Sequence, residues 1–189
     1  MKEDLRVMKT KRKLQEALLE LLREKPLEEV NISELCRRAK INRGTFYLHY
    51  DGVHDLFRLY VEEIMADLRM SYEEPFYQTN YQIELMQDKM IKIFNHVKNH
   101  QSFYQIIFDE KIPMMYYYIL FRKVKDFMLQ SMELMDIPEG ISLDYLSSYH
   151  TNALIGMLLQ WHQTQYTTPI DQLNKELTQI ISMNSHFRK

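Results

Sequence analysis

The sequence has very little glycine, proline and cysteine for its length. Of its 189 residues, four are glycine, five are proline and one is cysteine. β folds with many tight turns depend on glycine and proline, so their scarcity favours long helices. The single cysteine, Cys36, excludes an intramolecular disulfide and is typical of a reducing cytoplasm. We expect Cys36 to be a small buried core residue, because a redox role would need neighbours that stabilise a thiolate.

Long apolar runs and enzyme signatures are missing as well. The longest apolar stretches, around residues 112–121 and 153–159, are shorter than the ~20 residues that a helix needs to cross a bilayer, and no signal peptide is visible. There is no glycine-rich phosphate loop, no nucleophile elbow and no HExxH zinc motif. The sequence therefore predicts a cytoplasmic protein that is neither membrane-bound nor an enzyme and that carries no cofactor.

The charges are distributed unevenly along a chain whose formal net charge is −2. Residues 1–60 hold 13 Lys and Arg against 10 Asp and Glu, whereas residues 61–189 hold 11 against 16. A basic N-terminal segment followed by an acidic remainder indicates that a polyanion is bound at the N-terminal end only.

Residues 31–50, NISELCRRAKINRGTFYLHY, are the most informative stretch. Asn31 can cap a helix, and Glu34 three residues later completes a capping-box-like pair. The apolar residues that then repeat at helical spacing are Ile32, Leu35, Cys36 and Ala39. Residues 40–42 interrupt the pattern. A short second helix follows, capped by Asn42, with Phe46 and Tyr50 as its apolar positions.

The second helix carries polar residues outside this apolar stripe. Arg43 can read a base edge, Gly44 has no side chain, and three further residues can hydrogen-bond to phosphates: Thr45, Tyr47 and His49. A helix-turn-helix has this arrangement, because one helix crosses the DNA backbone while the N-terminal residues of the other meet base edges in the major groove. The stretch therefore predicts a DNA-binding helix-turn-helix.

The same stretch resembles the DNA-binding domain of TetR-type (TetR/AcrR) bacterial transcriptional regulators. The pattern is Ile32-x-x-Leu35-x-x-x-Ala39-x-Ile41-Asn42-x-Gly44-Thr45-Phe46-Tyr47-x-His49-Tyr50, followed by Leu56. Two residues depart from the family pattern. Lys40 stands where the family usually has glycine, so this turn would hold a non-glycine residue in an unusual backbone region. Val53 stands where the family usually has a lysine that touches the DNA backbone, so one phosphate contact would be lost.

The resemblance also implies which residues contact DNA. A densely basic helix start precedes the motif, and there Thr10 and Lys11 would contact phosphates; a solvated helix end would explain the same charges without DNA. The full set of DNA-binding residues that we expect is Thr10, Lys11, Ser33, Asn42, Arg43, Gly44, Thr45, Tyr47 and His49.

Periodicity along the chain predicts an all-α protein of about nine helices in two domains. Residues 1–70 would form a three-helix DNA-binding domain after a frayed start at residues 1–6, with a connecting helix over residues 55–68. The periodicity is lost at residues 71–80, which contain Pro75, so the boundary is placed there. Residues 71–189 would form a helical effector-binding and dimerisation domain. Its expected helices cover residues 81–100, 103–108, 113–135, 142–165 and a last stretch opened by Pro169.

The helix expected over residues 142–165 is apolar on more than one side and carries a row of small residues. Packing against the chain's own core would explain one face, but less easily both. TetR-like proteins dimerise through a four-helix bundle made by the last two helices of each subunit, so the resemblance implies a two-fold interface there. The interface residues that we expect are Ser148, Asn152, Gly156, Leu173, Leu177 and Ile180.

Aromatic and methionine residues are frequent in the second domain, where most would be plain core residues. The resemblance implies that a TetR-like body holds a small-molecule effector between its helices, in a mostly apolar pocket with a few polar groups. The candidate effector-binding residues are Phe103, Tyr104, Tyr117, Phe121, His150 and Trp161. The effector itself stays unknown.

His96 and His100 are four residues apart on a predicted helix and could present two ring nitrogens to a metal ion. No cysteine or carboxylate lies beside them at metal-site spacing. We therefore expect solvated histidines and no metal site.

These patterns predict a helical, two-part protein that is basic at one end, and the family resemblance implies a sequence-specific transcriptional regulator that acts as a ligand-responsive homodimer on a pseudo-palindromic double-stranded DNA operator. Repression is the commoner outcome in the resembled family. A rival hypothesis is a helical adaptor that acts mainly through a protein partner and binds little DNA itself. A third is a helical enzyme that handles a metal or a small molecule.

Overall fold

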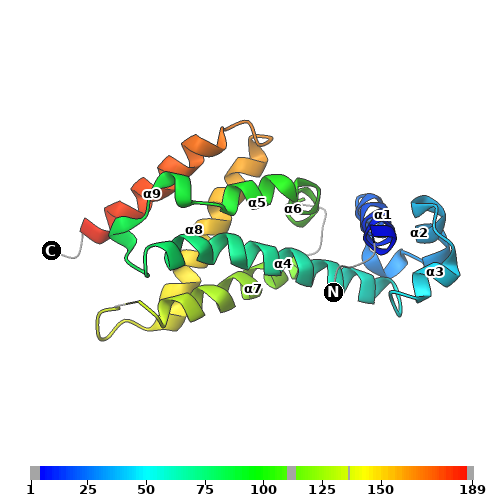
Figure 1. Cartoon of the computed structure of the whole chain (residues 1–189), viewed down its shortest axis with the longest axis horizontal. Coiled ribbons are helices and arrows are strands. Elements are labelled where there is room, and N and C mark those ends of the chain that lie inside the picture. Colours follow the sequence, from blue (N-terminus) through cyan, green and yellow to red (C-terminus); the bar gives the residue numbers. More distant parts are fainter. Residues whose placement is uncertain (1–4, 110–113, 136, 187–189) are drawn as a thin grey trace. The chain divides into compact units, whose positions relative to one another are not determined.

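The computed structural model describes residues 5–109, 114–135 and 137–186 (Figure 1). Within these ranges the chain forms nine α-helices, three 3-10 turns and no β-strand, so the all-α prediction is confirmed. The chain divides into two compact units, Met1–Ile64 and Met65–Lys189. The division falls inside helix α4 (Val53–Gln78), which continues from the first unit into the second.

The first unit contains α1 (Leu5–Leu22), a 3-10 turn (Leu27–Glu29), α2 (Ile32–Ala39), α3 (Arg43–Tyr47) and the start of α4. α1 packs against α2. Its buried face includes the apolar stripe predicted from helical spacing, namely Leu14, Ala17, Leu18, Leu21 and Leu22. The helix already includes residues 5 and 6, so the frayed start predicted there is wrong; residues 1–4 lie outside the described ranges.

The turn between α2 and α3 has the left-handed residue that the sequence predicted. Lys40 has φ 56° and ψ 42°. Its N–H donates to the carbonyl of Arg37 at 3.3 Å, and the N–H of Ile41 donates to that of Cys36 at 2.9 Å. This is the Schellman arrangement, which satisfies the last carbonyls of a helix and normally takes glycine at the left-handed position. The turn therefore keeps its geometry without glycine, at a cost in backbone strain.

α4 is longer than predicted, because Pro75 does not end it. The expected break at residues 71–80 is wrong: the helix runs through Pro75 to Gln78. A proline inside a helix removes one backbone hydrogen bond, but this one is buried and lies close to the helix end, where few bonds remain to be disturbed. The helix stops only where Asn80 and Tyr81 take positive φ values of 49° and 61°.

The single helix predicted over residues 81–100 is also wrong. The chain there forms two 3-10 turns, Ile83–Leu85 and Asp88–Met90, before α5 (Ile93–Asn99). Both turns contact α9 (Ile170–His186). Met86 and Ile91 are buried, and residues five apart on an α-helix point about 140° apart. An α-helix could not bury both against one neighbour, so tertiary packing overrides the local preference.

The remaining helices of the second unit lie close to the predicted ranges. They are α6 (Gln101–Ile107), α7 (Met114–Met132) and α8 (Leu143–Gln163), with α9 after them. Pro113, which was expected to open α7, lies outside the described residues. α7 and α8 pack against each other, and a salt bridge of 2.9 Å joins Lys125 Nζ to Asp144 Oδ1 across them.

Candidate DNA-binding surface

Two side chains hold α3 in place, one just before the helix and one within it. The Oδ1 atom of Asn42 accepts a hydrogen bond from the N–H of Gly44 at 2.8 Å. The Phe46 side chain is fully buried, and its ring centroid lies 5.6 Å from that of the buried Tyr50. The predicted cap and the predicted apolar positions of the second motif helix are therefore confirmed.

The residues on the other side of α3 are open to solvent. Arg43 and Gly44 are exposed, and Tyr47 keeps 51% of its surface accessible. A Cβ added to Gly44 would meet only Asn42 Oδ1, at an ordinary 3.5 Å. Glycine costs about 1 kcal/mol relative to alanine inside a helix, and no contact within the protein requires it at this position. Its missing side chain instead leaves the exposed face of α3 flat, which suits close approach of a partner surface.

The arginines of the first unit differ in how they are paired. Arg38 makes a two-pronged salt bridge to Glu24, with nitrogen–oxygen distances of 2.5 and 3.0 Å. Arg58 is held by Asp55 and Glu62. Arg43 forms no ion pair with any residue that the structure describes. Its charge is therefore available to an anion or a base edge from outside the protein.

The other predicted DNA-binding residues lie on three elements of the same unit. Ser33 is exposed in the first turn of α2, while Thr45 and His49 are half-buried in and after α3. Thr10 and Lys11 lie on α1, and the Thr10 hydroxyl donates to the carbonyl of Arg6 at 2.9 Å. The six predicted residues between Asn42 and His49 thus share one short segment, and the remaining three come from α1 and α2.

One residue of this surface escaped the sequence analysis. Leu48 directly follows α3 and is 79% exposed. It falls between the two apolar positions Phe46 and Tyr50, so the helical spacing already placed it outside the core stripe. An exposed leucine beside Tyr47 can make the apolar contact with a thymine methyl group that DNA-reading surfaces use.

Two other residues that the sequence analysis discussed, Val53 and Cys36, are buried in the core of the first unit. Val53, which departs from the resembled pattern, begins α4 and is 6% exposed. Cys36 is 3% exposed, and burial raises the pKa of its thiol against the smaller opposing effect of the Arg43 charge. A buried thiol is a poor nucleophile, so the prediction of a core cysteine is confirmed.

Models of known protein families match most of the chain. The family model described as "Bacterial regulatory proteins, tetR family" matches residues 14–59. A second, described as "Transcriptional regulator C-terminal region", matches residues 84–183, which is more than half of the chain. The chain belongs to the TetR family of transcriptional regulators. The family resemblance of the helix-turn-helix stretch is thereby confirmed.

The relatives of this TetR-family protein that are described next have low sequence identity to it. The "Uncharacterized HTH-type transcriptional regulator YxbF" of Bacillus subtilis (strain 168) is 18% identical over 177 residues, which cover 92% of this chain and 45% of that protein. The chain thus spans less than half the length of this relative. Two solved structures share the fold. The "Dihydroxyacetone kinase operon activator DhaS" aligns at a TM-score of 0.62 with 14% identity, covering 93% of this chain and 95% of that one. The "fatty acid degradation regulator FadR from Bacillus halodurans" aligns at 0.59 with 12% identity and 96% coverage of both chains.

The second unit of this regulator holds a cavity of about 200 Å³. Its walls come from α4, α7, α8, α9 and the segment before α5. Five methionines line it: Met86, Met128, Met132, Met135 and Met157. Methionine side chains adapt to irregular shapes, and Tyr149 and His150 add polar groups to the lining. The site has the composition of a pocket for a small, largely apolar molecule.

The six predicted effector-binding residues do not lie in one site. Only His150 belongs to the described cavity lining. Three of the others are buried core residues, namely Phe103, Tyr104 and Trp161. Tyr117 donates to Asn152 Oδ1 at 3.3 Å, and Phe121 is half-buried elsewhere on α7. The sequence analysis chose other aromatic residues, whereas the cavity is lined mostly by aliphatic residues and methionines, with Tyr72, Phe76 and Tyr149 as its aromatic members.

The predicted interface residues lie on both of the last two helices. On α8, Asn152 and Gly156 are exposed and Ser148 is half-buried. On α9, Leu173 is 6% exposed and faces the core, while Leu177 and Ile180 line the cavity.

Within the part of the chain that the structure describes, no helix is both long and apolar enough to cross a membrane.

Proposed function

We propose that the protein is a ligand-responsive repressor of the cytoplasm, which binds a pseudo-palindromic operator as a homodimer. The exposed face of α3 carries this proposal. There Arg43, Gly44 and Tyr47 stand on a helix anchored by Phe46, with an arginine that no described carboxylate neutralises. A charged, flat and rigid surface of this kind meets base edges and phosphates of the major groove.

Each residue on this face has its own part in DNA recognition. Arg43 reads a guanine edge, where a two-pronged hydrogen bond discriminates against the wrong base by about 1–3 kcal/mol. Gly44 allows the helix to come close to the bases. Tyr47, with Thr45 and His49 beside it, donates to phosphates and positions the helix without reading sequence.

The exposed face of α8 supports the homodimer. Tyr145 and Tyr149 keep 82% and 61% of their surface accessible, and Asn152 and Gly156 continue the same face. On α9, Ile180 and Met183 are 45% and 62% exposed. Apolar and small residues in such rows suit a helix-to-helix contact with a second copy. In the dimer, the two copies of α3 would lie about 34–36 Å apart, so that they enter successive major grooves.

The cavity supports the response to a ligand. Leu177 and Ile180 line the cavity and are also expected at the dimer interface. A molecule that fills the cavity therefore changes packing at the interface, and the dimer spacing that best accepts the ligand becomes more populated. If that spacing does not fit successive major grooves, the ligand releases the operator.

Fluorescence anisotropy tests the DNA-binding part directly. The probe is labelled DNA from just upstream of this protein's own gene, with scrambled DNA as competitor, at two salt concentrations. Arg43→Ala should weaken specific binding roughly 10- to 100-fold and relax base preference at one position of each half-site. Tyr47→Ala should weaken binding to all sequences alike. Arg58→Ala, which removes an arginine already held by two carboxylates, is the matched control and should change little.

Two results would contradict the proposal. If Arg43→Ala binds the upstream DNA as the parent does, α3 is not the reading helix. If binding ignores sequence and collapses at the higher salt, only the basic charge of the N-terminal unit is acting; the rival hypothesis of an adaptor that works through a protein partner would then be favoured. A reporter gene placed behind the upstream DNA shows whether the protein represses or activates transcription. If it is a repressor, expression of the reporter should rise when the gene for the regulator is deleted.

A further inference from the structure

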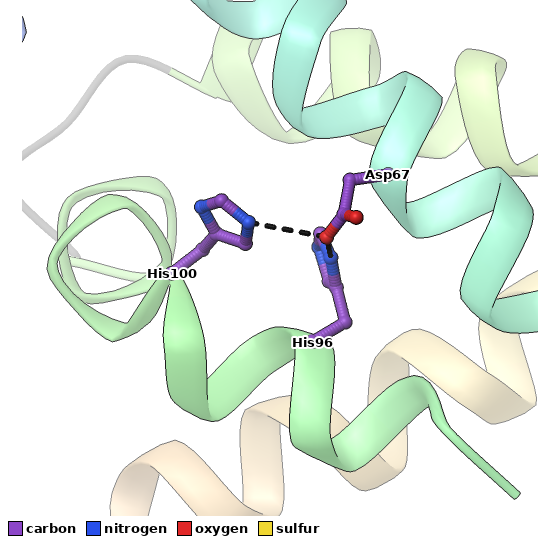
Figure 2. Close-up of side chains that lie close together, drawn as sticks. All are labelled: Asp67, His96 and His100. Atoms are coloured by element: carbon purple, nitrogen blue, oxygen red, sulfur yellow. Dashed lines mark hydrogen bonds and ion pairs between the residues drawn. The ribbon is translucent and has the colours of Figure 1, made fainter. Parts of the chain in front are cut away.

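Three side chains of the second unit converge although they lie far apart in the sequence. Asp67 comes from α4, His96 from α5 and His100 from the junction of α5 and α6 (Figure 2). His96 Nδ1 lies 2.5 Å from Asp67 Oδ2, and His100 Nε2 lies 3.2 Å from the same oxygen. One ligand atom from each residue lies within 4.8 Å of the other two. The prediction of solvated histidines is therefore wrong for His96, which is 2% exposed.

Behind this cluster, a buried hydroxyl holds the His96 ring. His96 Nε2 is 2.9 Å from the hydroxyl oxygen of Tyr104, a residue with no exposed surface. The Tyr104 ring packs at 5.3 Å from Phe103 and 5.9 Å from Phe108. The second ring nitrogen of a metal-binding histidine almost always has such a partner, because it sets the orientation of the ring and the position of its proton.

The protonation states suit a cation. Burial lowers the pKa of His96 to about 4, so its ring is neutral at pH 7. Burial alone would raise the pKa of Asp67, but its hydrogen bonds to the two histidines outweigh that effect and lower it, so the carboxylate is charged. A carboxylate only accepts, so His96 Nδ1 carries the ring proton and Nε2 accepts from Tyr104. A metal at Nδ1 needs that proton on Nε2, and the Tyr104 hydroxyl can accept it there by turning from donor to acceptor.

We propose that Asp67, His96 and His100 bind one divalent transition-metal cation of the zinc type. Zinc lies about 2.0–2.1 Å from nitrogen and oxygen ligands, which puts neighbouring ligand atoms of a tetrahedral site about 3.3 Å apart. The 3.2 Å between His100 and Asp67 has this spacing already. The 2.5 Å between His96 and Asp67 is a hydrogen bond that must open by less than 1 Å, and the Asp67 side chain is 51% exposed, so no buried neighbour encloses it on all sides.

The site has one open side and one closed side. His96 is inaccessible and Asp67 half-exposed, so a cation can enter along α4 and keep a fourth position for water or a small ligand. The cation would tie α4, the helix shared by both units, to the α5–α6 segment. The sequence analysis missed the site because Asp67 lies 29 residues before His96 and 33 before His100. This proposal does not depend on the function proposed above.

The test uses the full chain without an affinity tag, stripped of metal with a chelator and titrated with zinc sulfate at pH 7. Calorimetry and elemental analysis should give one zinc per protomer. With cobalt in place of zinc, the intense visible absorption of a four-coordinate ion should appear. Asp67→Asn and His100→Gln, both at partly exposed positions, should fold and bind zinc at least 100-fold more weakly. Tyr104→Phe, which removes only the partner of Nε2, should lose roughly 10- to 100-fold.

His54→Gln is the matched control, because His54 is an exposed histidine at the start of α4. It should bind zinc as the parent does. Zinc binding that persists unchanged in Asp67→Asn would place the metal elsewhere and overturn the proposal. Less than a fifth of an equivalent bound to the parent would also overturn it, and the cluster would then be a hydrogen-bonded network only.

Discussion

The stability of the second unit should fall steeply between pH 6.5 and pH 4, because His96 is kept neutral in the folded protein. Its pKa drops from the usual 6.5 to about 4, chiefly through burial, against the opposing effect of its hydrogen bond to Asp67. Between these pH values His96 is protonated in the unfolded chain but neutral in the folded chain. The free energy of unfolding therefore rises with pH up to 6.5 and decreases as the pH falls. Two and a half pKa units correspond to about 3 kcal/mol.

The single tryptophan makes this measurable in the unit that contains His96. Trp161 is 2% exposed and its ring lies 5.7 Å from that of Phe94, which neighbours His96 on α5. Urea unfolding followed by its fluorescence, in the presence of a chelator, should be measured at several pH values between 7 and 4.5. His96 alone should contribute close to one proton, or about 1.4 kcal/mol per pH unit near pH 5.

A variant separates this contribution from that of other titrating groups. His96→Gln should be less stable than the parent at pH 7, since it changes the hydrogen bonds to Asp67 and Tyr104, but its stability should depend on pH by about one proton less. The measurements are made above pH 4.5, because protonation of Asp67, whose pKa is lowered in the folded protein, also reduces stability at lower pH. His54→Gln, at an exposed position, should keep the parental slope. An identical slope in His96→Gln and the parent would refute the reasoning.

Two further predictions concern single backbone positions. Lys40→Gly should stabilise the first unit by up to about 1 kcal/mol, because a left-handed conformation costs a non-glycine residue about 1–2 kcal/mol and glycine gives back about 0.5–1 kcal/mol in entropy. Hydrogen exchange of the α2 amides measures this, and Arg37→Gly, at an exposed position in the last turn of α2, should instead reduce protection. Gly156→Leu should dissociate the proposed dimer without unfolding the protomer, because a Cβ at this position meets nothing within 4 Å in its own chain. Sedimentation measures the dimer, Gly156→Ala is the control, and a Leu variant that stays dimeric would remove Gly156 from the interface.

Local features of the helix-turn-helix could be predicted from the sequence because neighbouring residues decide them. Asn31 caps α2 through the N–H of Glu34 at 2.9 Å, and Asn42 caps α3 through Gly44. The left-handed Lys40 was expected because it stands where the resembled family usually has glycine. Caps, turns and amphipathic stripes involve residues at most five apart, so the sequence pattern contains all the information that they need.

The features that failed all depend on packing between distant segments. Residues 71–80, which contain Pro75, were expected to interrupt the helices, but the burial of Pro75 close to the end of α4 makes the lost hydrogen bond tolerable. Residues 81–92 carry helical spacing, yet they form two 3-10 turns that contact α9, and Met86 and Ile91, which one helical face cannot present together, are both buried. Local preference is weak here, and contacts made with a helix some 80 residues later decide the path.

The sequence by itself determined that this protein is an all-helical TetR-family regulator with a helix-turn-helix over residues 31–50, because helical spacing, caps and turn residues are properties of neighbouring positions. Only the tertiary structure decided which residues enclose the cavity and that Asp67 meets His96 and His100. Those groupings arise where α4, α5, α7, α8 and α9 pack together, and periodicity within one helix carries no information about the partner that another helix will bring to it.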